Sequence, residues 1–237
     1  MTTSRAGGKA KGRATRVAPP KRSASSGRNA LAGIVLRALS REGLLLLQDP
    51  RLPSVAGIVA GGPVRGSWWG HGKGSDIFRV SDWLADHPEV VVTRLVSRKV
   101  TYVHRKLWPA IVAIGRERQP WQMRRLSRLA RSILDRVERA GSLRTDRIPG
   151  PPRRVSDAAR ELEDGLLVHT EWIHTERGSH ARRLESWDRW ERRMKTAGRA
   201  PVARPAGRAR AALERVVAGM NSRCAADGRL PWQDEGR

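Results

Sequence analysis

The sequence predicts an α+β protein that is mainly helical. In several segments the apolar residues recur at the spacing of amphipathic helices, whereas two pairs of short segments alternate apolar and polar residues as strands do. The composition of the two ends of the chain indicates where the folded part begins and ends. Both ends of the chain are rich in Gly, Ala, Pro and Arg and poor in large apolar residues. We therefore expect a folded centre between disordered basic termini.

The two terminal segments carry positive charge and have little to bury. Residues 1–28 contain no acid, and their few apolar residues cannot offset the entropy lost on ordering, so we expect a disordered basic arm. Residues 191–237 have a similar composition, and we expect a basic, mostly disordered tail that contains one helix at residues 208–220. The bases of the N-terminal arm are Arg5, Lys9, Lys11, Arg13, Arg16, Lys21, Arg22 and Arg28.

Residues 29–115 predict a helical domain with one β-hairpin. Residues 90–96 and 99–104 are rich in Val, Thr and Tyr, and the two residues between them predict a tight connection. Pro109 favours the first turn of a helix that follows the hairpin. Four helices are expected, at residues 30–40, 54–60, 75–85 and 110–116.

Residues 116–190 predict a helix, a short strand, a very short helix, a second full helix and a two-stranded ribbon. Gly178 favours a tight turn between the two strands of the ribbon. This order of elements is typical of a winged-helix domain, a helix-turn-helix variant whose ribbon is the wing. The elements are expected at residues 124–140, 142–144, 145–146, 157–166, 167–175 and 180–187.

Three segments of this domain carry a resemblance to a known family: Ala158-Ala-Arg-Glu-Leu-Glu163, Leu166-Leu-Val168 and His174-Thr-Glu-Arg-Gly-Ser-His180. With them, residues 126–190 resemble the winged-helix domains of bacterial proteins similar to the crosslink-repair DNA glycosylases. Gln48-Asp49-Pro50-Arg51 is similar to the glutamine-containing active-site stretch of that family, but Leu46 stands where its first glutamine would be. The resemblance implies a DNA-binding fold over about a quarter of the chain, and it does not transfer the glycosylase activity.

The charge balance indicates a polyanionic partner. The 237 residues include 47 Lys and Arg against 23 Asp and Glu, a formal net charge of +24. Such an excess favours nucleic acid, and we expect DNA rather than RNA. No apolar run approaches the roughly 20 residues of a membrane span, and the N-terminus lacks the apolar core of a signal peptide. With Cys224 as the single cysteine, we expect a cytoplasmic, nucleoid-associated protein with no membrane partner.

Within the predicted winged-helix domain, the candidate DNA contacts flank the second full helix and lie on the ribbon. The helix carries four acids and only one arginine, Arg160, and an acidic face would be repelled by the major groove. We therefore expect contacts to the DNA backbone or minor groove, with a packing or protein-contact module as the alternative. The acids are Asp157, Glu161, Glu163 and Asp164. The expected contact residues are Arg153, Arg154, Arg177, His180, Arg182 and Arg183.

A glycine-rich loop at residues 66–74 is a second candidate contact. It holds two adjacent tryptophans, and an exposed indole beside cations can stack on an unpaired or flipped base. Its glycines do not have the spacing of a phosphate-binding Walker loop. Two indoles in the hydrophobic core are the alternative. The expected contacts are Arg65, Trp68, Trp69 and Lys73.

Two other classes of function stay open. One is a DNA repair or processing enzyme with an active site in the N-terminal half, and the other is an RNA-binding or ribosome-associated protein. We expect a binding protein rather than an enzyme, because no nucleophile, base or carboxylate pair stands at a recognisable spacing. The enzyme hypothesis requires Gln48, Asp49, Trp68, Trp69, His71 and His104 to meet in one pocket.

Metal-binding side chains are frequent on the predicted ribbon. However, His169 and His174 fall on opposite faces of a strand, so a zinc site would lack a third ligand. We expect no metal and no cofactor. The residues concerned are His169, Glu171, His174, Glu176 and His180.

Overall fold

The computed structural model describes residues 23–175, 178, 180–199 and 205–234. Helices alternate with two small antiparallel sheets, which confirms the predicted α+β class. Residues 1–22 of the expected basic arm lie outside the described residues. None of the described helices is long and apolar enough to cross a membrane.

The first sheet consists of β1 (Leu44–Leu46), β2 (Val90–Arg94) and β3 (Val100–His104), in the order β1-β3-β2. The predicted hairpin of β2 and β3 is therefore confirmed. The leucine run Leu44–Leu46 forms a third strand, β1, that was not predicted. Successive side chains of a strand point to opposite faces. Leu44 and Leu46 join one hydrophobic cluster and Leu45 joins another, so both faces of the sheet are covered.

One face of this sheet packs against α1 (Ser23–Glu42), α2 (Val55–Ala60) and α3 (Gly74–Ala85). All three helices were predicted. Residues 23–28 were expected to be disordered, but they form the first turns of α1. The later turns of the helix are anchored by buried residues such as Val35 and Leu39, and a helix that is anchored in this way can extend beyond them.

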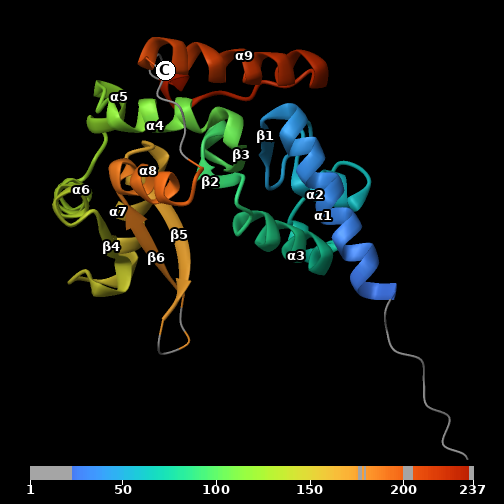
Figure 1. Ribbon diagram of the computed structural model, residues 1–237, viewed down its shortest axis with the longest axis horizontal. Coiled ribbons are helices and arrows are strands. Elements are labelled where there is room, and N and C mark those ends of the chain that lie inside the picture. The colour runs from blue at the N-terminus through green and yellow to red at the C-terminus, as the bar shows by residue number, and fades with distance from the viewer. Residues whose placement is uncertain (1–22, 176–177, 179, 200–204, 235–237) are drawn as a thin grey trace, which may run out of the picture.

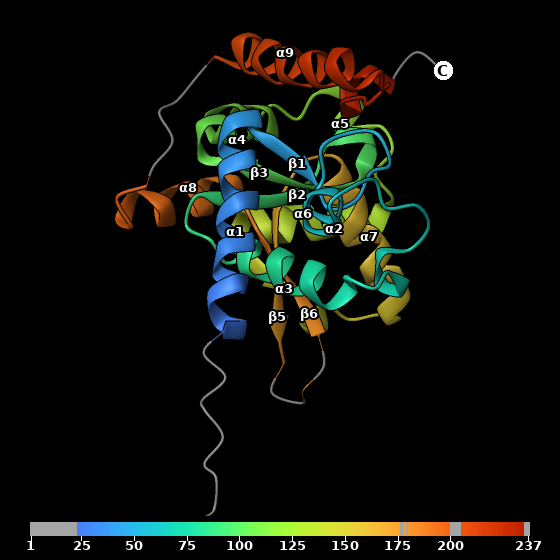
Figure 2. The ribbon, with the colours of Figure 1, turned by 90° about the vertical axis from the view of Figure 1, so that its right-hand side faces the viewer.

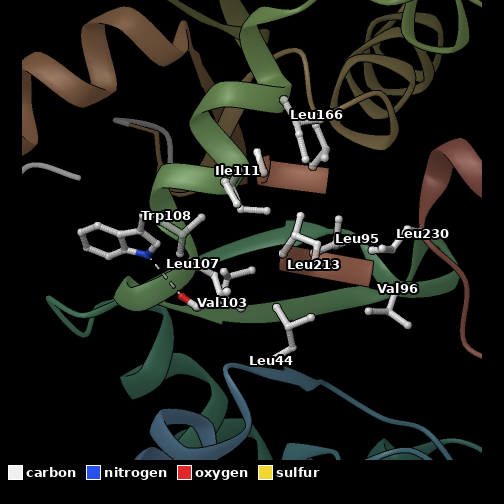
Figure 3. Close-up of a cluster of buried hydrophobic side chains, with 14 of the residues drawn as sticks. Leu44, Leu95, Val96, Val103, Leu107, Trp108, Ile111, Leu166, Leu213 and Leu230 are labelled. Atoms are coloured by element: carbon white, nitrogen blue, oxygen red, sulfur yellow. Dashed lines mark hydrogen bonds between the residues drawn. The ribbon is translucent and has the colours of Figure 1, made fainter. Parts of the chain in front are cut away.

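The other face of the sheet packs against α4 (Trp108–Arg116), α8 (Trp187–Thr196) and α9 (Ala206–Cys224). Figure 1 shows α9 lying along α4. Figure 3 shows buried side chains of the cluster formed by the first sheet, α4 and α9, where Trp108 Nε1 donates a hydrogen bond of 3.3 Å to the carbonyl oxygen of Val103 in β3.

The C-terminal segment differs from the prediction. It was expected to be mostly disordered beyond a helix at residues 208–220, yet it contains the end of α8, the longer helix α9 and a 3-10 turn at Pro231–Asp234. Leu213, Val217 and Leu230 are fully or almost fully buried in the hydrophobic cluster that joins the first sheet to α4 and α8. These few apolar residues bind the segment to the core because they recur at helical spacing, although the segment as a whole is polar.

The second sheet packs against α6 and α7, and their buried residues form a separate hydrophobic cluster with Leu184 of β6. Its strands are antiparallel in the order β4-β6-β5, and β5 and β6 form a ribbon that projects from the body of the molecule (Figures 1 and 2). The elements of this region are α5 (Pro120–Met123), α6 (Arg128–Ala140), β4 (Ser142–Arg144), the 3-10 turn η4 (Thr145–Arg147), α7 (Pro152–Asp164), β5 (His169–His174) and β6 (His180–Glu185).

Two helix boundaries in this region differ from the prediction. The helix expected at residues 124–140 begins only at Arg128, because Ser127 caps α6 by accepting a hydrogen bond from the Ala130 amide. Helix α7 begins at Pro152 rather than near Asp157, since proline suits the first position of a helix. Arg153 and Arg154 therefore belong to the first turn of α7.

Candidate nucleic-acid interface

The outer face of α7 carries arginines that have no acidic partner. Arg153, Arg154 and Arg160 are exposed, and within the described part of the chain none of them forms an ion pair. Arg153 and Arg160 stand seven residues apart, which places them two turns apart on the same face of the helix. This face begins at the start of α7 and runs along its exposed side.

Three of the four acids of α7 lie on sides of the helix that contact the rest of the fold. Glu161 Oε2 accepts a hydrogen bond of 2.7 Å from the Ser127 amide at the start of α6. Glu163 Oε1 accepts one of 2.9 Å from the Thr170 hydroxyl, and Asp164 Oδ1 accepts one of 2.6 Å from Arg94 Nε. Of the four acids, only Asp157 is exposed without a partner among the described residues. The expectation of an acidic outer face is therefore wrong: the outer face is basic.

Arg182, expected to be a surface contact, is instead 8% exposed. Its Nη2 lies 3.3 Å from the Ser156 hydroxyl of α7, and its Nη1 lies 3.8 Å from Glu163 Oε2. Burial raises the pKa of the Glu163 carboxyl, against the lowering effect of its hydrogen bond from Thr170. Arg182 thus ties β6 to α7, because strand alternation turns its side chain toward the helix.

The ribbon has one aromatic face and one charged face. On the aromatic face, Trp172 is 66% exposed and its ring lies 4.9 Å from the guanidinium carbon of Arg182. His174 and His180 face each other nearby, with ring centroids 4.5 Å apart. On the opposite face, Arg183 forms an ion pair with Glu171. Arg177, also expected as a contact, lies outside the described residues.

A groove separates the aromatic face of the ribbon from the start of α7. Its cavity volume is about 490 Å³. Sequence reasoning did not single out Trp172, although a tryptophan in an otherwise polar strand is an unusual feature that could have been noted. The residues that line the groove include Thr145, Ser156, Trp172, His180 and Arg182.

The two tryptophans of the glycine-rich loop occupy different environments. Trp68, in the 3-10 turn η1 (Trp68–Gly70), is 9% exposed and belongs to the core under α1–α3, whereas Trp69 is 65% exposed. Their rings stack with centroids 4.1 Å apart, and Trp69 also contacts Phe78 of α3 at 5.5 Å. Arg65 and Lys73 are exposed near them in the chain and form no ion pair within the described residues.

The residues required by the enzyme hypothesis do not meet in one place. Gln48 holds the start of the loop by donating hydrogen bonds to the carbonyl oxygens of Val64 and Gly66. Asp49 pairs with Lys99, just before β3 begins, at 2.7 Å. His104 lies at the other end of β3, and a strand of that length separates its ends by more than about 13 Å.

Asp49 and His104 also have partners that explain their presence without catalysis. Asp49 accepts hydrogen bonds from the amides of Arg51 and Leu52, and these bonds contribute to a lowered pKa although burial acts in the opposite direction. His104 accepts a hydrogen bond from the Lys106 amide at the start of a 3-10 turn, and burial lowers its pKa. Among the described residues, no group of three or more His, Cys, Asp or Glu side chains is placed to hold a metal ion.

Comparisons with known proteins identify no relative of this chain. No family model matches the chain, and neither the curated proteins nor the solved structures contain a significant match. The resemblance of residues 126–190 to winged-helix domains stays a prediction.

Proposed function

We propose that residues 126–185 form a winged-helix unit that binds duplex DNA. The order of its elements and the strand order β4-β6-β5 support this assignment, with α6, η4 and α7 as the three helical elements and β5–β6 as the wing. In such a unit, α7 occupies the place of the helix that enters the major groove.

The observation that carries the proposal is the separation of charge on α7. Three arginines without acidic partners face outward, while three of the four acids contact other elements of the fold. A duplex that approaches this face meets three cations and one exposed acid, Asp157. Arginine is also the side chain best suited to pair with phosphate or guanine, through its planar fork of donors.

The remaining charge of the chain supports the same partner. The net charge of +24 gives a strong long-range attraction to a polyanion, and the bases of residues 1–22 add to it. We assign docking on the duplex to the outer arginines of α7, and non-specific attraction to the basic segment before α1.

The proposal is tested by measuring duplex binding of the full chain by fluorescence anisotropy. The variant with Arg153→Ala, Arg154→Ala and Arg160→Ala should bind a 25-base-pair duplex about tenfold more weakly or worse at moderate salt, because three phosphate or base contacts are lost. A matched control removes three exposed arginines from other elements, none with an ion pair among the described residues. The control substitutions are Arg139→Ala, Arg192→Ala and Arg208→Ala.

The control should retain most of the affinity, since it removes the same net charge from other elements. Equal losses in both variants would show that only net charge matters and would refute docking through α7. An RNA duplex of the same sequence serves as a second ligand, and equal or tighter binding to it would favour the RNA alternative.

A further inference from the structure

The groove between α7 and the ribbon is lined by Arg182, whose guanidinium is not fully hydrogen-bonded by the described residues. Arg182 Nη1 is buried and has no hydrogen-bond partner among the described residues; its nearest carboxylate oxygen, on Glu163, is 3.8 Å away. Arg182 itself lines the groove, so its guanidinium places a positive charge beside any anionic ligand bound there.

The start of α7 borders the same groove. Its N-cap residue, Pro151, offers no side-chain cap, and the first turn contains no acid. The amides of Arg153 and Arg154 have no acceptor within the described residues, and Pro152 and Ser156 both line the groove. Unpaired amides and the positive end of a 13-residue helix together favour a phosphate group.

Trp172 supplies a flat apolar surface at the same groove. One side of its indole lies against the Arg182 guanidinium, and two-thirds of the residue is exposed. A nucleobase stacks well on an exposed indole, but only a base that has left the duplex stack offers its face. The groove volume of about 490 Å³ falls in the range of sites for single small ligands.

We propose, on the basis of the DNA-binding function above, that this groove receives one unpaired nucleotide of the bound DNA. Its base stacks on Trp172, and its phosphate binds at the start of α7 and at Arg182. The protein would then prefer duplexes that contain an extruded nucleotide over fully paired duplexes. This preference would come from the ribbon, whereas affinity for the paired duplex would come from the outer arginines of α7.

Three hairpin DNAs of the same stem test the proposal by anisotropy with the full chain. The first is fully paired, the second carries one bulged adenine, and the third carries an abasic residue at the bulge. The bulged adenine should bind about fivefold or more tightly than either of the other two, because only it provides both a phosphate and a base for stacking.

The variant Trp172→Ala should lose this preference and keep its affinity for the paired hairpin within about twofold. Trp83→Ala, which removes another exposed tryptophan on α3, is the matched control and should keep the preference. Thermal melting of both variants verifies that each is folded.

The outcomes separate the inference from the function on which it rests. If the wild type binds the paired hairpin but shows no preference for the bulged adenine over the abasic bulge, the groove inference is overturned and the proposed function survives. A preference that persists in Trp172→Ala overturns the assignment to this groove. If none of the three hairpins binds, both proposals fail together.

Discussion

The stacked pair Trp68 and Trp69 allows a prediction in which two adjacent residues of one type give opposite results. An aromatic side chain buries about 150–250 Å², and each Å² of apolar surface contributes about 25 cal/mol. Trp68 is 9% exposed, so Trp68→Ala should lower the free energy of unfolding by about 3–5 kcal/mol. Trp69 is 65% exposed, so about a third of that surface is covered and its loss in Trp69→Ala should cost only about 1.3–2.2 kcal/mol.

The assay is denaturant unfolding of both variants, followed by affinity for single-stranded DNA at a concentration where each is folded. If Trp69 stacks on an unpaired base, Trp69→Ala should weaken single-strand binding by about tenfold while leaving most of the stability. A loss of more than about 3 kcal/mol in Trp69→Ala would contradict its exposed position. Unchanged single-strand binding in a folded Trp69→Ala variant would remove the loop from the nucleic-acid contacts.

Two further predictions concern buried polar residues of the second sheet. Arg182→Ala should lower the free energy of unfolding by about 3–5 kcal/mol, because it leaves Glu163 buried without its cation. Arg183→Ala breaks only an exposed ion pair and should cost less than about 1 kcal/mol. Similar losses for the two variants in denaturant unfolding would contradict the burial of Arg182. Burial, aided by Arg193 and Arg183, lowers the pKa of His169 from 6.5 to about 3, so the folded state keeps this histidine neutral. The unfolded chain binds the extra proton as the pH falls from 6.5 toward 3, and this residue should reduce stability by about 1.4 kcal/mol per pH unit in that range. His169→Phe, which suits the neighbouring Trp187 and Trp190, should remove that part of the pH dependence; an identical pH slope in variant and wild type would refute it.

Much of the secondary structure could be predicted from local patterns. The hairpin at residues 90–104 alternates in the way strands do, and Ser54 and Gly141 mark helix ends that the structure also has. Strand β1 was missed because Leu44, Leu45 and Leu46 are all buried, and a strand covered on both faces has no alternation to detect. Helix α8 was missed, and only residues 208–220 of α9 were expected, because the stability of these helices comes from contacts with α4 and the first sheet rather than from their own composition.

The candidate interface was predictable only in part, because the position of a charge depends on its partners. Arg153 and Arg154 were expected as contacts beside the helix, and both are exposed, although they belong to its first turn. The side chains of Glu161 and Glu163 are oriented by hydrogen bonds from the Ser127 amide and the Thr170 hydroxyl, and only tertiary structure brings these donors near. The burial of Arg182 likewise depends on Ser156 and Glu163 of α7, which only tertiary structure brings near it.

The most direct measurement of the central claim is the salt dependence of duplex binding. The slope of log affinity against log salt counts the phosphate contacts, at about 0.9 for each one. We predict that removing Arg153, Arg154 and Arg160 together reduces the magnitude of this slope by about 2.7, if all three contact phosphates. The triple control at Arg139, Arg192 and Arg208 should leave the slope nearly unchanged. An unchanged slope in the α7 variant, or an equal reduction in the control, would contradict the claim that α7 is the DNA-binding face.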